Sequence, residues 1–201
     1  MAIPYKNYVN IKDNCYISYL GFNKEFIVCL NYLLPYIKKE FEGLNIKVIL
    51  REEYCEKYNG VSMKTINPKE IGFIHEIKCD MKSHPLEDFF QNANIKIPSF
   101  CFKEYKNNDS KKCVITTNGL PPNKKINYKK LENKFKNMGF TVFENGGFED
   151  AGLVVGMETE DFYEASFNGI KTILIPSGVG ENFFKKLFPN NQILKYEEYI
   201  I

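Results

Sequence analysis

The chain has 201 residues, of which 44% are apolar, with 17 Phe and 13 Tyr, and this composition excludes intrinsic disorder. Its 27 Lys and Arg nearly cancel its 25 Asp and Glu, so no overall basic field favours nucleic acid as a partner. Arg51 is the only arginine. We therefore expect any phosphate to be held by backbone amides, helix N-termini or lysines rather than by arginine forks.

The six cysteines are widely spaced and form no Cys-x-x-Cys pair. We expect buried thiols rather than a disulfide framework, which is typical of smaller secreted domains. The N-terminus shows no pattern of a secretory leader, so a reducing, cytoplasmic location is expected. No apolar stretch approaches the ~18–20 residues that cross a bilayer, so attachment to a membrane would be peripheral.

The first half of the chain predicts an alternation of strands and helices. Strands are expected over 15–20, 46–50 and 71–77, and a long helix over 24–41, kinked or divided at Pro35 because proline removes a backbone donor. A polar stretch over 52–59 is a candidate short helix. Residues 103–112 contain almost no apolar side chain and are the best candidate for a linker.

The second half has clearer boundaries between its predicted elements. Asn127 is expected to cap a helix over 128–137 that Gly139 ends. Further helices are expected over 160–168 and 180–188, and strands over 113–117, 140–143, 152–156, 171–176 and 192–195. This alternation predicts an α/β protein with doubly wound, mostly parallel sheets. We expect two small halves, residues 1–105 and 112–201.

Three strand ends in the second half gather small and hydroxyl side chains. In doubly wound sheets, ligands bind outside the carboxyl ends of strands, where glycine-containing loops lead into helices. The helix that starts near 178–181 offers free amides and a positive dipole end, which suit a diphosphate. The candidate binding residues at these ends are Thr117, Asn118, Gly119, Glu158, Thr159, Ser177, Gly178 and Gly180.

The string from Gly156 to Pro176, GMETEDFYEASFNGIKTILIP, resembles the donor-binding segment of GT-B-type glycosyltransferases. In that segment a glycine ends a strand, a short helix carries Glu-Ala, and a second glycine precedes the next strand. The resemblance covers about residues 112–195 and implies two Rossmann-like halves. It assigns Glu164 to the ribose hydroxyls of a nucleotide-sugar and Lys124 to its phosphates.

The resemblance implies a transferase that moves a sugar from a nucleotide-sugar donor to a glycan or lipid-linked acceptor. Residues 112–201 would be the donor side and residues 1–105 the acceptor side. Glu76 and Asp80 are the candidates for a catalytic base. No cofactor and no bound metal are expected, because GT-B proteins neutralise the leaving diphosphate with loop amides and helix dipoles.

Several of these residues also have purely structural interpretations. Glu158 lies at a helix start, where a carboxylate is favoured without a ligand, and Lys124 opens a lysine-rich run typical of a solvated face. His75 alternates with apolar neighbours in a predicted strand, whereas His84 lies near Asp80 in an unspecific acidic cluster. Neither histidine is favoured as a catalytic or metal-binding residue.

Two other functions remain open from the sequence. One is a non-catalytic module that binds a nucleotide or phosphate and works with a partner. The other is a nucleoside hydrolase or phosphorylase, for which Glu158 and Glu164 would supply the carboxylate pair. The sequence lacks a GxGxxG fingerprint, a GxxxxGK[ST] loop and a GxSxG elbow, which disfavours dinucleotide-binding, P-loop and α/β-hydrolase functions.

Overall fold

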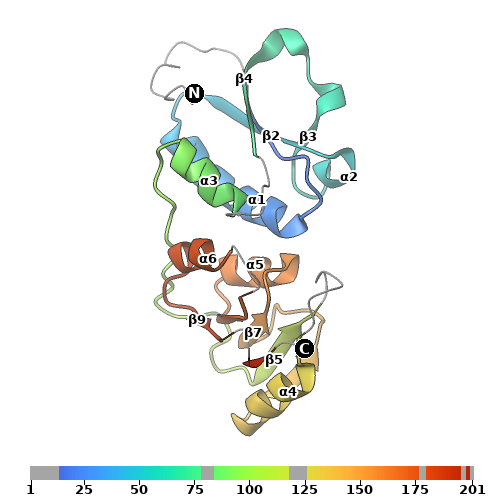
Figure 1. Ribbon diagram of the computed structural model, residues 1–201, viewed down its shortest axis with the longest axis vertical. Coiled ribbons are helices and arrows are strands. Elements are labelled where there is room, and N and C mark those ends of the chain that lie inside the picture. The colour runs from blue at the N-terminus through green and yellow to red at the C-terminus, as the bar shows by residue number, and fades with distance from the viewer. Residues whose placement is uncertain (1–13, 78–83, 118–125, 177–179, 196–197, 200–201) are drawn as a thin grey trace. The chain divides into compact units, whose positions relative to one another are not determined.

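The computed structural model describes residues 14–77, 84–117, 126–176, 180–195 and 198–199 (Figure 1). The chain divides into two compact units, Met1–Pro98 and Ser99–Ile201, here called unit 1 and unit 2. Each unit carries its own parallel sheet with flanking helices. The α/β fold class expected from the sequence is therefore confirmed.

Within the described part of unit 1, four parallel strands form a sheet in the order β3-β2-β1-β4. The strands are β1 (Asn14–Ser18), β2 (Asn45–Leu50), β3 (Val61–Ser62) and β4 (Ile71–Glu76). The short β3 was not expected from the sequence, because two residues carry no periodicity. The helices are α1 (Lys24–Glu40), α2 (Glu52–Cys55) and α3 (Pro85–Asn92), with 3-10 turns η2 (Met63–Thr65) and η3 (Pro68–Glu70).

Helix α1 runs unbroken through Pro35, so the expectation that this proline divides the helix was wrong. Proline leaves the carbonyl four residues earlier, that of Asn31, without its helical donor. Both Pro35 and Asn31 are exposed, so water can satisfy that carbonyl. The opposite face of the helix, which includes Leu30, Leu33 and Ile37, is buried and holds the helix in place.

His84 begins helix α3 as a buried cap, and among the described residues it belongs to no group of side chains arranged to hold a metal ion. Its Nδ1 accepts a hydrogen bond from the Leu86 amide at 3.3 Å. Its ring meets the ring of Phe26 edge-on at 4.6 Å between centroids, which ties α3 to α1; the two helices lie side by side in Figure 1. Burial lowers the pKa of His84 to about 3.

Unit 2 contains a five-stranded parallel sheet in the order β6-β5-β7-β8-β9 among its described residues. The strands are β5 (Lys112–Thr116), β6 (Thr141–Glu144), β7 (Leu153–Gly156), β8 (Thr172–Leu174) and β9 (Gln192–Ile193). The helices are α4 (Tyr128–Asn137), α5 (Glu160–Phe167) and α6 (Glu181–Leu187). Asn127 Oδ1 accepts from the Lys130 amide at 3.1 Å, which confirms the predicted cap of α4.

Helices cover both faces of the unit 2 sheet, with α4 on one face and α5 and α6 on the other (Figure 1). On the α4 side, Leu131 and Phe135 pack into a cluster with alternate residues of β5, β7 and β8. On the other side, the rings of Phe162 and Phe184 join α5 to α6 at 5.3 Å between centroids. The central strands β5, β7 and β8 are therefore buried on both faces, as expected for a doubly wound arrangement, whereas the edge strand β6 is largely exposed.

Residues 103–112, which the sequence suggests as a linker, belong instead to unit 2, and β5 begins at the last of them. The Phe100 amide donates to the Leu187 carbonyl at 2.7 Å, and the Lys106 amide donates to the Gly169 carbonyl at 2.8 Å. Asn107 and Ser110 donate side-chain bonds to carbonyls in the segment 149–151. Hydrogen bonds from side-chain amides and hydroxyls thus hold this segment against the rest of unit 2. Its packing could not be predicted from the sequence, because the segment has few apolar residues.

The cysteines of the described residues are free thiols. Cys15, Cys29 and Cys113 are buried as expected, and burial raises the pKa of Cys113 to about 12. Cys101 is exposed, so the expectation of burial was wrong at that position. Among the described residues, no helix combines the length and apolar character that a bilayer crossing requires.

We predict that His84 makes stability depend on pH. The folded chain keeps this imidazole neutral down to a pKa of about 3, whereas an unfolded chain binds the proton below about pH 6.5. Stability is therefore lost as pH falls below 6.5, at about 1.4 kcal/mol per pH unit once the unfolded histidine is fully charged. His84→Asn keeps a capping side chain that does not titrate.

Urea unfolding at pH 5.5 and 4.5 measures this effect. The wild type should lose about 1.4 kcal/mol more than His84→Asn over that interval. Equal losses in the two proteins would contradict the assignment.

Candidate functional site

The strand order of unit 2 reverses between β5 and β7. The chain passes from β5 to β6 on one side and then returns to place β7 on the other side of β5. The carboxyl ends of two such strands flank a crevice that binds ligands in doubly wound sheets. Thr116 and Thr117 lie at the end of β5, and Gly156 lies at the end of β7. This edge of the sheet is the candidate site.

Thr116 and Gly156 are register partners at this edge and approach very closely. A side-chain carbon at Gly156 would lie 1.9 Å from Thr116 Oγ1, so only glycine fits. Thr116 is 2% exposed, and its hydroxyl oxygen has no hydrogen-bond partner among the described residues. A buried polar atom without a partner is uncommon and often marks a functional region. The sequence analysis did not single out Thr116 as a candidate.

Thr117 is held in a hydrogen-bond network with the end of β6. Its amide donates to Asn145 Oδ1 at 2.7 Å, and its hydroxyl accepts from Asn145 Nδ2 at 2.7 Å. The same hydroxyl donates to Glu144 Oε1 at 3.1 Å. Asn145 has a φ of +55°, a left-handed conformation that asparagine tolerates. These contacts position the first loop of the site and were not visible in the sequence.

The carboxylate of Glu158 lies against Gly180 at the start of α6. A side-chain carbon at Gly180 would lie 1.7 Å from Glu158 Oε1, and that oxygen is buried. The structure thus brings together two of the predicted binding residues from different loops. A carboxylate at a helix N-terminus is stabilised by the free amides there. A diphosphate bound at this end of α6 would meet the negative charge of Glu158.

Thr159 and Glu164 occupy different faces of α5. Thr159 is the N-cap: its buried hydroxyl accepts from the Phe162 amide at 3.4 Å. Glu164 is half-buried and shares the more accessible face of the helix with Glu160 and Asp161. The N-terminus of α5 follows the end of β7, and Glu164 lies four residues after the first residue of that helix.

The other predicted residues fall into two groups. Glu76 ends strand β4 of unit 1 and is exposed. The remaining candidates lie outside the described residues: Asp80, Asn118, Gly119, Lys124, Ser177 and Gly178. Among the residues that the structure describes, no group of three or more His, Cys, Asp and Glu side chains is arranged to hold a metal ion.

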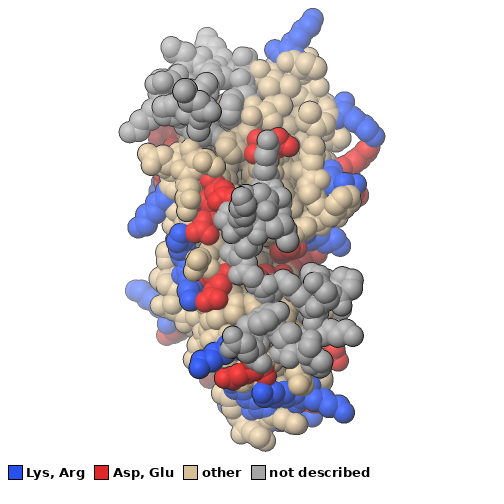
Figure 2. All heavy atoms as spheres, in the orientation of Figure 1, with Lys and Arg blue, Asp and Glu red and all other residues tan. Residues whose placement is uncertain are grey.

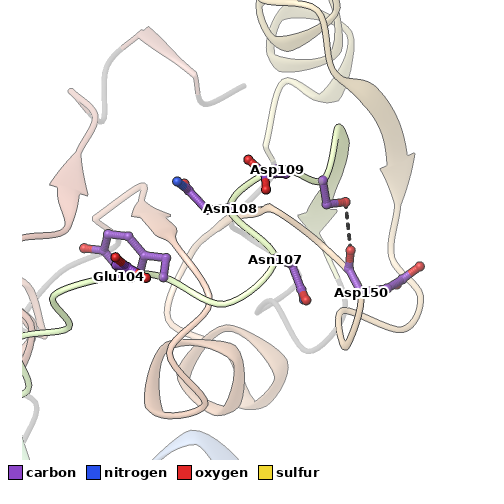
Figure 3. A pocket seen from close by; sticks show the side chains of 7 residues that line it. Glu104, Asn107, Asn108, Asp109 and Asp150 are labelled. Carbon is purple, nitrogen blue, oxygen red and sulfur yellow. Dashed lines mark hydrogen bonds between the residues drawn. The ribbon is translucent and has the colours of Figure 1, made fainter.

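An open pocket of about 600 Å³ lies at the opposite edge of the same sheet (Figure 3). Its lining includes Glu104, Asn107, Asp109 and Asp150, and it adjoins the amino ends of β5 and β7. The Ser110 hydroxyl donates to the Asp150 carbonyl at 2.8 Å, as the dashed line in Figure 3 shows. These bonds attach segment 107–110 to the sheet, and the pocket lies away from the strand ends that bind ligands in this fold.

No protein-family model matches the chain, and no curated protein does so either. Similar solved structures do exist. One is the bacterial iron-containing dodecameric glycosyltransferase TibC from enterotoxigenic E. coli H10407, at a TM-score of 0.55 and 9% identity. Another is dodecameric iron-containing heptosyltransferase TibC in complex with ADP-D-β-D-heptose, at a TM-score of 0.52 and 10% identity.

The α/β fold of this chain is similar to that of these two TibC structures. The likeness covers 81% and 82% of this chain respectively, so it extends over parts of both units. The chain matches only 57% and 58% of the length of the two TibC structures. The likeness agrees with the α/β fold expected from the sequence, whereas the resemblance of the segment 156–176 to GT-B-type glycosyltransferases stays a prediction.

We predict that Gly156→Ala destabilises unit 2 by about 1–3 kcal/mol, because the new methyl group overlaps the Thr116 hydroxyl. Adding Thr116→Ala removes that oxygen and should restore part of the loss. Gly147→Ala is the matched control, since its methyl group meets only the carboxylate end of the Glu149 side chain. Thermal or urea unfolding of the variants provides the measurement. A Gly156→Ala protein as stable as the control would contradict the close approach.

Proposed function

We propose that the chain is a glycosyltransferase that binds a nucleotide-sugar donor in unit 2 and transfers the sugar to a glycan or lipid-linked acceptor. The observation that carries this proposal is the strand-order reversal at β5 and β7, with Gly156 leading into α5. Glycine is required here because the Thr116 hydroxyl fills the space of a side chain, and glycine-containing loops at such strand ends bind ligands in doubly wound sheets. A similar fold in complex with ADP-D-β-D-heptose supports a donor of this class.

Glu164 is proposed to accept hydrogen bonds from the ribose hydroxyls of the donor. It lies one turn beyond the start of α5, so its carboxylate can reach a nucleoside held at the strand ends. Ribose offers two adjacent hydroxyl donors, and a carboxylate has two oxygens to accept them. The Gly156 turn and the amides that follow it are proposed to face the phosphates, together with Thr117, Asn118, Gly119 and Lys124.

The loop that contains Ser177, Gly178 and Gly180 is the second proposed contact with the donor. Glu158 approaches Gly180 so closely that a phosphate cannot occupy the same position. We therefore propose that this loop contacts the sugar, whose hydroxyls can donate to the Glu158 carboxylate. Thr159 supports the site by capping α5.

Sugar transfer requires a group that takes the proton of the acceptor hydroxyl. The acceptor oxygen attacks the anomeric carbon, the bond from that carbon to the diphosphate oxygen breaks, and the nucleoside diphosphate leaves with the electron pair. A carboxylate within hydrogen-bond reach of the hydroxyl can accept its proton. Glu76 and Asp80 remain the candidates for this base, with the acceptor on the side of unit 1.

We predict that Glu164→Ala weakens donor binding by about 10- to 150-fold, because a hydrogen bond to a charged group contributes roughly 1.5–3 kcal/mol. Glu132→Ala is the matched control, since Glu132 is a half-buried glutamate on α4. Calorimetric titration with ADP-, UDP-, GDP- and CMP-sugars measures both. Equal affinities of Glu164→Ala and the control would refute the ribose assignment.

A second candidate function is a binding module without catalysis, favoured by the partial coverage of the TibC length. Assaying donor hydrolysis and transfer on the same samples separates the two. Turnover that Glu76→Gln lowers, while donor affinity is unchanged, supports the transferase. Donor binding without any turnover supports the module, and release of free base would indicate nucleoside hydrolysis instead.

A further inference from the structure

The only arginine of the chain lies at the carboxyl edge of the unit 1 sheet. Arg51 follows β2, and Phe22 lies in the segment between β1 and α1. Strands β1 and β2 are hydrogen-bonded neighbours, so their carboxyl ends lie side by side. Phe22 is 66% exposed, the highest fraction among the exposed large apolar side chains of the described residues. An exposed aromatic ring is therefore paired with the one guanidinium.

The guanidinium of Arg51 is fixed by two contacts. Its Cζ lies 3.7 Å from the centroid of the Phe22 ring, which is a stacking distance. Its Nε donates to Glu53 Oε1 at 2.8 Å. The two terminal amino groups have no hydrogen-bond partner among the described residues. Four of the five N–H donors of the group thus remain available in a fixed plane.

The Glu53 carboxylate already offsets part of the positive charge of Arg51. Glu52, which follows Arg51, is paired with Lys64 at 2.6 Å, so its own charge is compensated. On the face shown in Figure 2, acidic and basic side chains are interspersed rather than gathered into one field. Anion binding would therefore depend on the geometry of a single group and not on the overall charge.

The use of arginine at this position is itself informative. The chain has 26 lysines, and any of them would supply a positive charge. Only a guanidinium combines a flat face that stacks on an aromatic ring with parallel donors that match two oxygens of a carboxylate or phosphate. The stack on Phe22 also holds the plane in place, which lowers the entropy lost on binding.

We propose that Arg51 and Phe22 form a binding site for the oxyanion of an acceptor, either a carboxylate or a phosphate. The two terminal amino groups of Arg51 donate parallel hydrogen bonds to two of its oxygens. The open face of the Phe22 ring packs against the apolar part of the same molecule. Leu20 and Met63, which follow β1 and β3, add exposed apolar surface at this edge. That the molecule is the acceptor rests on the proposed function; the anion site does not.

The presence of one arginine makes a direct test available, because a ¹⁵N spectrum of the chain contains a single arginine Nε–H signal. Sodium phosphate and sodium acetate are titrated separately, with sodium chloride at equal ionic strength as the reference. The Arg51 signal should move saturably with at least one oxyanion, with a midpoint in the roughly millimolar range expected of one charge-assisted contact. A response to phosphate alone or to acetate alone identifies the type of group.

Three variants distinguish a binding site with fixed hydrogen-bond donors from an exposed positive charge. Phe22→Ala should weaken the oxyanion affinity several-fold, because the guanidinium loses its support. Arg51→Lys should weaken the oxyanion affinity about tenfold or more, because the parallel donors are lost although the charge remains. This variant has no arginine signal, so its binding is measured through the backbone amide signals of residues 50–53. Met138→Ala is the control, since Met138 is an exposed methionine of unit 2, 58% accessible, and it should leave the affinity unchanged.

A signal that moves equally in chloride would overturn the proposal, and so would affinities that Phe22→Ala and Arg51→Lys leave unchanged. The two proposals also fail separately. A chain that binds nucleotide-sugars but shows no oxyanion response refutes the Arg51 site alone. A chain with the oxyanion response and no nucleotide-sugar binding refutes the donor assignment alone.

Discussion

The close approach of β5 and β7 is the constraint on which the candidate site depends. At their carboxyl ends Thr116 and Gly156 are in register, and the Thr116 hydroxyl occupies the space that any side chain at Gly156 would need. Because the strand order reverses at this pair, the helices that follow β5 and β7, α4 and α5, cover opposite faces of the sheet. Ligands of doubly wound sheets bind in the crevice at such a reversal, which makes this edge the candidate site.

The charges at the carboxyl edge of the unit 2 sheet differ between the start of α6 and the start of α5. Glu158 places a carboxylate against Gly180, so the start of α6 is already compensated by the protein's own charge. The start of α5 is capped by the neutral hydroxyl of Thr159, with Glu164 one turn further along the helix. Negative side chains are suited to hydroxyl donors such as those of ribose and sugar, whereas phosphates require the amides nearer Gly156.

Local patterns in the sequence predicted the elements, but contacts between distant residues could not be predicted. The Asn127 cap defines the start of α4 because capping involves only the next three residues. Pro35 does not divide α1, and Asn31, whose carbonyl loses its helical donor, faces solvent. The cap that His84 provides and its contact with Phe26 of another helix were not predicted. The pairs Glu158 with Gly180 and Arg51 with Phe22 likewise join separate loops. The sequence shows the glycines and the single arginine, but it does not show which residues of other loops they contact.

The central claim is that the β5–β7 carboxyl edge of unit 2 binds a nucleotide-sugar. The most direct measurement is a map of backbone amide shifts on adding ADP-heptose or another nucleotide-sugar to the ¹⁵N-labelled chain. The account predicts the largest changes at Thr116, Thr117 and Gly156 and along the first turns of α5. Changes confined to the pocket beside Glu104 and Asp150, at the opposite edge of the sheet, would contradict it, as would a spectrum that no nucleotide-sugar alters.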